Sequence, residues 1–281
     1  MKRYIFSISA ILFTLAIHAQ SVLSFGLRGG LDFMMPKSEC AAKAKLGIAE
    51  NFDLGYTYYW NTRNNGDWGI HTGVSIGYAQ NRTFLEFTQQ YTNYDYLHNE
   101  MLYTTSGTID AKLRRFYVEI PLMAAFRHNG FVTQLGIKGQ SAIWSRATQN
   151  LVSPMIDAYY VQYDVHVTNE LVTGIVADQD LEKSDANIAP RLNLLLAARI
   201  GYEFKIGYSG SLGIMAYVDY NVWNTSSYQT GQRVIDVSPI TNTASPVPNV
   251  LVNPAFSSLI SRINPLQVGI SICYSLNFEK Y

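Results

Sequence analysis

The sequence predicts an all-β fold, a transmembrane antiparallel up-and-down β-barrel of eight strands. Three observations predict this fold class. Apolar and polar residues alternate along eight segments with the period of a β-strand. The connections alternate between short Asn- and Gly-rich turns and long loops, and aromatic residues gather beside the short turns. A soluble β-sandwich is the alternative, because alternation alone fits any sheet with one apolar face.

The composition also separates this chain from an ordinary soluble protein. Charged residues make up 15% of its 281 residues, against ~25% in a typical soluble domain. The formal net charge is zero, so the chain lacks a general attraction for nucleic acid, and we expect no nucleic-acid partner. No apolar run after residue 19 approaches the ~20 residues of a membrane helix.

The N-terminus has the pattern of an export signal. Met1–Arg3 is basic, an apolar run follows, and Ala19 is a small residue suited to precede cleavage. Residues 1–19 are therefore predicted to be a cleaved signal peptide. Residues 20–281 are predicted to form the barrel domain with four long extracellular loops. A core helix of a cytosolic protein is the alternative for the apolar run.

The first three predicted strands lie in residues 22–33, 52–60 and 68–79. Each has one apolar face and one face of small, polar or charged residues. A single ionised residue, Glu50, falls on the apolar face, near the end of the second strand. The three apolar faces carry Leu23, Phe25, Leu27, Leu31 and Phe33; Phe52, Leu54, Tyr56, Tyr58 and Trp60; and Trp68, Ile70, Val74, Ile76 and Tyr78.

The fourth strand, in residues 114–130, shows the alternation most clearly. Every second residue from Phe116 to Phe126 is apolar, whereas Arg115 and Glu119 lie on the other face. The apolar face is predicted to meet lipid, because an arginine in the middle of the bilayer would cost ~2–4 kcal/mol there. Pro121 cannot donate to a ladder, and a closed barrel has no edge strand. We therefore predict a local irregularity at Pro121.

The last four strands are predicted in residues 131–143, 191–204, 211–222 and 265–278. Their apolar faces carry Phe131, Leu135 and Ile137; Leu192, Leu194, Leu196, Ile200, Tyr202 and Phe204; Leu212, Ile214, Val218, Tyr220 and Val222; and Leu266, Val268, Ile270, Ile272, Tyr274, Leu276 and Phe278. Aromatic residues at the short-turn ends of the strands are predicted to form an interfacial girdle.

The charged residues on the opposite faces are predicted to line a narrow polar lumen, where opposite charges can pair. The interior of an eight-stranded barrel is roughly filled by its own side chains. A wide pore is therefore not expected, and a structural network is favoured over a gated path. The predicted network comprises Arg28, Asp32, Arg115, Glu119, Lys138, Arg199, Glu203 and Asp219.

The long connections are predicted in residues 34–45, 80–113, 146–190 and 224–263. The second is expected to extend two strands above the membrane as a hairpin. The third forms either an extracellular hairpin or two further membrane strands that turn at residues 168–170, which would make ten strands. Four prolines make residues 238–254 an irregular loop. Tyrosine-rich loops suit protein recognition, although tyrosine is also frequent in barrel extensions.

No residue pattern points to catalysis, a cofactor or a metal. The sequence has no H-E-x-x-H motif, and His71 is expected to be a packed or hydrogen-bonded lumen residue. Cys40 and Cys273 are far apart in sequence, and two cysteines in an exported chain permit one disulfide but do not require it. We expect no enzymatic activity, with a lipid-modifying barrel as the alternative.

One motif resembles a known family. The segment Tyr117, Glu119, Ile120, Pro121 and Leu122 resembles the Y-x-E-I-P-L segment of the PorT-like outer-membrane β-barrel family of Bacteroidetes bacteria. The glycine-rich first strand and the aromatic end of the last strand are also similar to that family. The resemblance implies an outer-membrane barrel, but the family is functionally diffuse. One namesake is needed for protein secretion across the outer membrane.

These observations lead to an expected function and expected partners. We expect a non-enzymatic structural or protein-interaction role in the outer membrane, with an accessory role in secretion or assembly as the alternative. A lipid-modifying enzyme or a narrow channel is less favoured. The expected partners are outer-membrane lipid and lipopolysaccharide, together with envelope secretion or assembly proteins.

Overall fold

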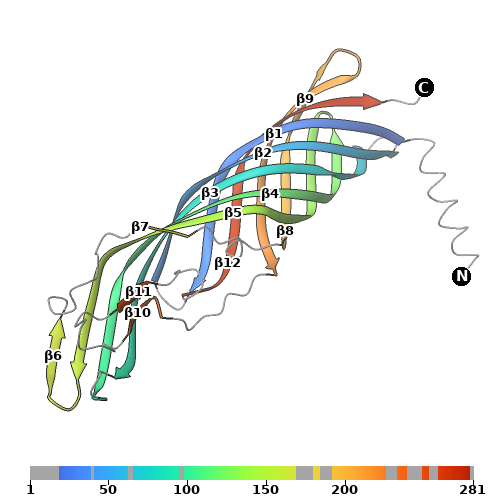
Figure 1. Ribbon diagram of the computed structural model, residues 1–281. Helices are drawn as coiled ribbons and strands as arrows, with labels where there is room; N and C mark the ends of the chain where they lie inside the picture. The colour runs from blue at the N-terminus through green and yellow to red at the C-terminus, as the bar shows by residue number, and fades with distance from the viewer. Residues whose placement is uncertain are drawn as a thin grey trace, which may run out of the picture.

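A computed structural model describes residues 19–38, 41–62, 66–94, 98–168, 180–183, 192–225, 233–238, 249–252 and 259–278 (Figure 1). The predicted signal peptide lies outside these ranges, apart from Ala19. Cys40, the second potential disulfide partner, is also outside them. Among the residues described, no helix is long and apolar enough to cross a membrane.

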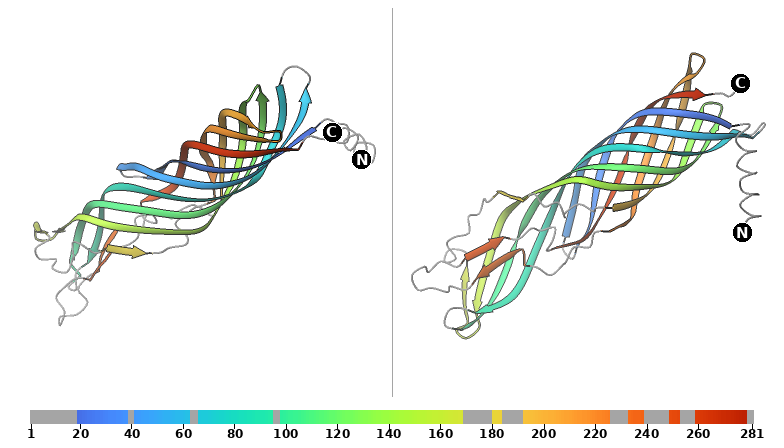
Figure 2. Two further views of the ribbon diagram at one scale, coloured as in Figure 1. Left: turned by 90° about the horizontal axis from the view of Figure 1, so that it is seen from above. Right: turned by 45° about the vertical axis from the view of Figure 1, so that its right-hand side comes forward.

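The described residues form twelve β-strands, eight of which close into a barrel. Each of the eight is antiparallel to both neighbours, in the order β1-β2-β3-β4-β5-β8-β9-β12 and back to β1. This closed ring confirms the predicted all-β barrel (Figure 2). The strands are β1 (Ala19–Ser38), β2 (Ala41–Thr62), β3 (Gly66–Tyr94), β4 (Glu100–His128), β5 (Phe131–Tyr160), β6 (Val165–Thr168), β7 (Asp180–Lys183), β8 (Leu192–Ile206), β9 (Gly210–Asn224), β10 (Ile235–Ser238), β11 (Asn249–Val252) and β12 (Ile260–Phe278).

The ten-strand alternative is wrong. Strand β6 folds back on the end of β5, where Val165 pairs with Tyr160, and β7 pairs with β5 nearer the barrel. Neither strand enters the ring, so the segment forms a hairpin beyond the barrel. The chain turns at residues 161–164, and the predicted turn at residues 168–170 lies, apart from Thr168, outside the described residues.

Both termini of the ring and its short turns lie at one end, here called the turn end, and the opposite end is called the loop end (Figure 1). At the turn end, β4 and β5 are joined by Asn129 and Gly130, whose φ angles are 50° and 84°. Asn and Gly tolerate this left-handed conformation, which two-residue hairpin turns require. The predicted short turn after residue 127 is therefore present.

Strands β3, β4 and β5 continue far past the loop end of the ring as one sheet, here called the extension. Pairing between β3 and β4 runs without a break from Gln80 and Arg114 to Tyr94 and Glu100. The predicted hairpin in residues 80–113 is therefore present. Figure 2 shows these strands extending, toward the lower left of both views, well beyond the other strands of the ring.

Two predicted loops are partly strand. In the segment 34–45, β1 continues to Ser38 and β2 begins at Ala41, because alternation persists there and both strands find neighbours to pair with. In the segment predicted to be irregular, Asn249–Val252 forms β11 and pairs with β10. The four prolines that motivated that prediction, at positions 239, 246, 248 and 254, lie outside the described residues.

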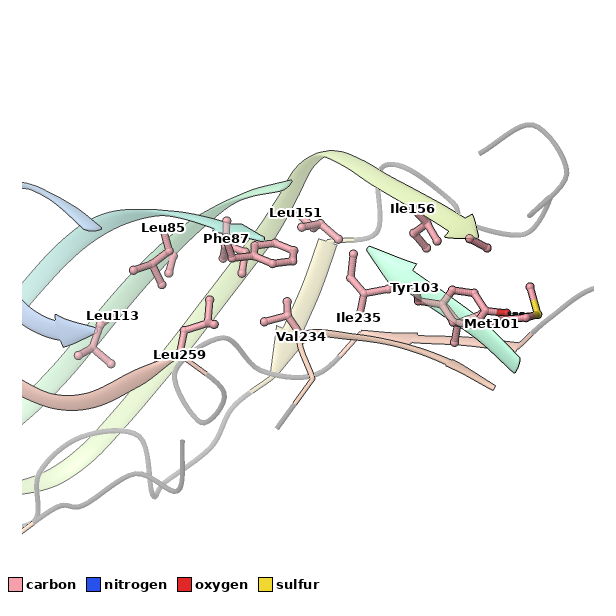
Figure 3. Close-up of a cluster of buried hydrophobic side chains, with 14 of the residues drawn as sticks. Leu85, Phe87, Met101, Tyr103, Leu113, Leu151, Ile156, Val234, Ile235 and Leu259 are labelled. Carbon is pink, nitrogen blue, oxygen red and sulfur yellow. Dashed lines mark hydrogen bonds between the residues drawn. The ribbon is translucent and has the colours of Figure 1, made fainter. Parts of the chain in front are cut away.

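Where the extension begins, the polar and apolar faces of the sheet change sides. Within the ring, outward side chains are apolar and inward ones polar, as Ile120 and Glu119 illustrate. In the extension, inward Leu113 and Leu85 are buried and apolar, whereas outward Lys112 and Arg82 are charged. This inversion gives the extension a hydrophobic core of its own, which Figure 3 shows.

Pro121 interrupts the sheet on one side only. Its neighbour β3 pairs with β4 at Leu122 and again at Glu119 in the same register, but not at the two positions between them. On the other side, Pro121 stays in register with Lys138 of β5. The predicted irregularity is therefore a gap in one ladder rather than a bulge. A bulge does occur in β5 at a different position. Phe116 of β4 pairs with Trp144 of β5, whereas the next residue, Tyr117, pairs with Ala142.

Candidate functional site: a closed lumen and the sheet above it

Two rows of aromatic residues bound the apolar wall of the barrel. At the turn end, Trp68 packs against Phe126 with ring centroids 4.9 Å apart and ring planes tilted by 51°, in the position predicted for a girdle. A second row crosses β3, β4 and β5 at the base of the extension. In it, Phe116 lies 5.3 Å from Tyr78 and 6.5 Å from Trp144 between ring centroids. This row was not predicted from the sequence, because its three members lie in three separate segments.

The spacing of the two rows fits a membrane. Phe116 and Phe126 are ten residues apart on β4 (126 − 116 = 10). At ~3.4 Å per residue and a strand tilt of ~40°, this span rises about 25 Å, which matches the apolar band of outer-membrane barrels. Large apolar side chains between the rows are exposed, including Ile120 at 58% and Leu135 at 65%. A wall of this kind would be unstable in water.

The single ionised residue of the predicted apolar face lies at the edge of this wall. Glu50 is exposed and pairs with Tyr78 of the second aromatic row. Its carboxylate is therefore at the level of the boundary rather than midway between the two aromatic rows. Charges on the outer face of a barrel cost much less near the interface than at mid-depth.

Arg28 of β1 is the centre of the lumen network. It is 2% exposed, and its guanidinium donates to three carboxylates on three other strands. Nη2 donates to Glu119 Oε2 at 2.6 Å, Nη1 to Asp219 Oδ2 at 3.0 Å, and Nε to Asp53 Oδ1 at 3.0 Å. The planar guanidinium has several donors in fixed directions, so one arginine can join strands from opposite sides of the barrel.

Two further cations complete this cluster. Lys138 Nζ donates to Asp219 Oδ2 at 2.6 Å, and Arg199 Nη2 to Asp53 Oδ2 at 3.3 Å. Three cations therefore face three carboxylates, and the cluster is electrically balanced. Burying charges is costly unless they are paired and hydrogen-bonded, so this balance is what allows them to fill the lumen.

Three predicted members, Asp32, Arg115 and Glu203, lie apart from the central cluster, and one member of the cluster, Asp53, was not part of the predicted network. Arg115 Nη2 donates to Asp32 Oδ2 at 2.7 Å as a separate buried pair. Glu203 lies nearer the turn end, and no ion pair to it is present among the described residues. Asp53 was placed on the lumen face by its alternation, but its position between Arg28 and Arg199 depends on the stagger of non-adjacent strands.

Small residues make room for the large side chains of the lumen. A Cβ atom added at Gly77 would lie 2.5 Å from the ring of Tyr117, and one at Gly30 would lie 2.6 Å from the hydroxyl of Tyr217. The Tyr217 ring also lies under the Arg28 guanidinium, 5.3 Å from its centroid. Around the Arg28 cluster the interior is thus filled with side chains, and a small cavity of about 20 Å³ lies on its turn-end side, near His71 and Glu203.

The lumen is closed a second time at the loop end by apolar residues. Met34, Leu85, Leu113 and Leu259 are buried together at the base of the extension core. Figure 3 shows Leu113, Leu85 and Leu259 leading into the cluster that continues along the extension. A hydrated path through the barrel would have to cross both the charged cluster and this apolar layer.

The extension core is covered by β10 and the residues before it. Val234, Ile235 and Val237 are fully buried against the inward face of the extension, and Figure 3 shows the first two within the cluster. Three β3 side chains, two residues apart, hold this segment by its backbone. Gln89 accepts from Val234 N at 2.8 Å, Tyr91 from Val237 N at 3.0 Å, and Asn93 donates to Val237 O at 2.8 Å.

Two residues of types often found in catalytic sites, His71 and Cys273, lie on the inward face of the barrel. His71 faces the lumen and shares a hydrogen bond of 2.8 Å between Nδ1 and Thr57 Oγ1. Cys273 is a free, half-buried thiol on β12. In the part of the chain that the structure describes, no cluster of His, Cys, Asp or Glu could hold a metal ion.

The segment that resembles the PorT-like motif is divided between the two sides of the wall. Tyr117 and Glu119 point inward, where Tyr117 exchanges hydrogen bonds with Gln267 and Glu119 binds Arg28. Ile120 and Leu122 face outward and are exposed. This one segment of β4 therefore supplies side chains both to the lumen network and to the apolar wall.

The tip of the extension exposes several aromatic and apolar side chains. Tyr163 is 61% exposed and Tyr94 is 53% exposed, and Val161 and Val165 are exposed beside Tyr163. The hairpin is ordered by a hydrogen bond of 2.9 Å from Tyr159 to Asp164. The apolar side chains at the tip are thus held on a structured hairpin.

Comparisons with known proteins add little to these observations. No protein-family model matches the chain, and no curated protein matches it. Among solved structures, the chain is similar to the outer membrane protease OmpT from Escherichia coli, with 8% identity over 92% of this chain and 96% of that one, at a TM-score of 0.28. It is also similar to the copper transporter OprC, with 12% identity over 92% of this chain and 46% of that one, at a TM-score of 0.19. With scores this low, the assignment of the fold rests on the closed ring of strand pairings itself.

Proposed function

We propose that this chain is an integral outer-membrane β-barrel that acts as a non-enzymatic structural or interaction component through its extension. The wall supports the membrane location, because its exposed apolar band is about as tall as a bilayer core and is bounded by aromatic rows. Outer-membrane barrels have short periplasmic turns and longer extracellular loops. The extension is therefore assigned to the cell exterior.

One observation carries the proposed role. The lumen is filled by the Arg28 cluster and closed by an apolar layer, whereas the extension continues sixteen residues beyond Phe116 (116 − 100 = 16) and ends in exposed tyrosines. That is roughly 50 Å of strand, which is far more than closing the barrel requires. Tyrosine provides contact area at low entropic cost, so the tip suits a protein partner.

An accessory role in secretion or assembly is the second candidate. The resemblance of Tyr117–Leu122 to the PorT-like segment favours it. The two candidates differ in whether a stoichiometric partner binds the extension. A lipid-modifying enzyme has less support, because His71 is buried against Thr57 and has no carboxylate partner among the described residues.

Photocrosslinking in intact cells tests the proposal. A photoreactive phenylalanine analogue replaces Tyr163 at the tip or, as a control of similar exposure, Leu196 on the apolar wall. We expect a discrete crosslinked protein from Tyr163 and only lipid from Leu196. A secretion or assembly component among the crosslinked proteins would select the second candidate. Equal crosslinking to the same proteins from both positions would contradict a specific role for the extension.

A further inference from the structure

The outer face of the extension carries a concentration of cations directly above the second aromatic row. Arg114 lies one row above Phe116 and pairs across β5 with Arg146. In the next row, Arg82 of β3 stands between Lys45 of β2 and Lys112 of β4. Five cations from four strands therefore occupy two adjacent rows, and this set is called the basic surface.

Carboxylates balance only part of this surface: Glu182 of β7 pairs with Thr148, which in turn pairs with Lys112, and Arg146 has a contact of its own. Asp110 binds Arg82 through both of its oxygens, with Nε donating to Oδ1 at 2.7 Å. Within the described residues, neither Lys112 nor Arg114 forms an ion pair, and Lys45 lies over the ring of Phe84, 3.9 Å from its centroid. Like charges directly opposite one another destabilise a sheet, so an anion bound here would stabilise these rows.

The basic surface borders a cleft on the outside of the barrel. A cleft of about 580 Å³ is lined by Arg82, Asp110, Lys112 and Thr148 on its polar side and by Leu46 and Ile48 on its apolar side. Its volume is in the range of small-ligand clefts. The register places the apolar side toward the membrane wall, since Ile48 pairs with Gln80, two residues from Tyr78.

We propose that the basic surface binds the phosphate groups of an anionic lipid in the outer leaflet. Arg82, Lys112 and Arg114 contact the phosphates, and the acyl chains lie along the wall from Ile48 to Phe116. Arginine suits phosphate recognition because its planar donors match the oxygens in pairs. Long cationic side chains can also keep their stems on apolar surface while the charge faces a headgroup.

This inference rests on the proposed membrane location and adds a ligand class to it. The height of the cations relative to the membrane favours a lipid over a soluble anion as the ligand. They begin one row above the aromatic boundary, which is where lipid phosphates lie relative to an interfacial girdle. The tip, where a protein partner is proposed, is many residues away and has a different composition.

The test uses the full chain, purified in neutral detergent and titrated with a bis-phosphorylated glycolipid, with bound lipid counted by native mass spectrometry. The variant Lys112→Gln/Arg114→Gln removes two cations of the basic surface. The control Lys205→Gln removes an exposed cation near the turn end, at the opposite end of the wall from the basic surface. We expect about tenfold weaker lipid binding for the first variant and binding within about twofold of the wild type for the control.

Two further binding measurements show whether the phosphates of a lipid or free phosphate occupy the basic surface. The same glycolipid without its phosphates should bind equally to both variants, and inorganic phosphate alone should bind far more weakly than the lipid. Equal losses in both variants, binding that ignores the phosphates, or inorganic phosphate binding as tightly as lipid would each overturn the proposal. Heat-modifiable migration in gels verifies that every variant is folded. Failure here would leave the crosslinking result at Tyr163 unaffected.

Discussion

Arg28 and Glu119 lie 91 residues apart in sequence, and their side chains meet across the lumen at 2.6 Å. They belong to β1 and β4, which are separated by two strands in the ring. Both are almost completely buried, and the same guanidinium binds Asp53 and Asp219. This single contact therefore ties together parts of the wall that share no backbone pairing.

The first prediction concerns this contact. Arg28→Met should destabilise the barrel by about 3–5 kcal/mol, because it leaves buried carboxylates without their shared partner. Unfolding by urea in lipid vesicles measures the change. Glu86→Gln is the control, since it removes an exposed pair with Lys43 and should cost about 0–1 kcal/mol. Equal effects of the two substitutions would show that the lumen cluster is not structural.

The second prediction tests the apolar wall on a single strand. Val74 lies between the two aromatic rows on the outer face of β3, and Thr88 lies on the outer face of the same strand in the extension. Val74→Arg should lower folding stability in vesicles by about 2–4 kcal/mol, whereas Thr88→Arg should change it by less than about 0.5 kcal/mol. A reversed order of the two effects would contradict the assignment of the membrane boundary.

The third prediction concerns the cover of the extension core. Ile235 is fully buried, so Ile235→Ala should lower the local stability of the extension by about 2–5 kcal/mol. Amide hydrogen exchange should accelerate in the described residues of 85–113, while exchange in the ring strands stays slow. Val161→Ala is the exposed control and should leave exchange in this segment unchanged. Uniform acceleration throughout the barrel would mean that the extension has no separate core.

The fourth prediction is that the wild-type barrel does not conduct. The Arg28 cluster and the apolar layer around Leu113 are two successive barriers in one narrow lumen. Planar bilayer recordings should show no steady channel after insertion, and insertion is verified independently by flotation with lipid. Reproducible step conductances from the purified protein would contradict the closed lumen.

Much of this architecture could be predicted from the sequence. Residues that alternate along a strand face the apolar wall and the polar lumen in turn, so their chemistry alternates as well. Residues such as Ile120 and Glu119 have opposite chemistry because one faces a wall and the other a lumen. The extension was harder to delimit, since alternation continues through it with the faces exchanged. The change from Phe116 outward and Arg115 inward to Lys112 outward and Leu113 inward is visible in the sequence. It is the signal that marks the boundary.

The partners within the lumen could not be predicted in the same way. Alternation places Arg28, Asp53 and Glu119 inside, but which of them meet depends on the stagger of β1, β2 and β4 around the ring. Arg115 binds Asp32 rather than joining the central cluster for this reason. The basic surface was missed because Lys45, Arg82 and Lys112 become neighbours only through strand pairing.

Cysteine accessibility in intact cells tests the central claim most directly. In a chain with both native cysteines replaced by serine, single cysteines are placed at Tyr163 on the extension, Tyr208 at the turn end or Leu196 on the wall, all three of which are exposed in the isolated structure. A membrane-impermeant maleimide should label the Tyr163→Cys variant in intact cells, the Tyr208→Cys variant only after the outer membrane is permeabilised, and the Leu196→Cys variant in neither case. Equal labelling of all three positions in intact cells would contradict a barrel that spans the outer membrane with its extension outside.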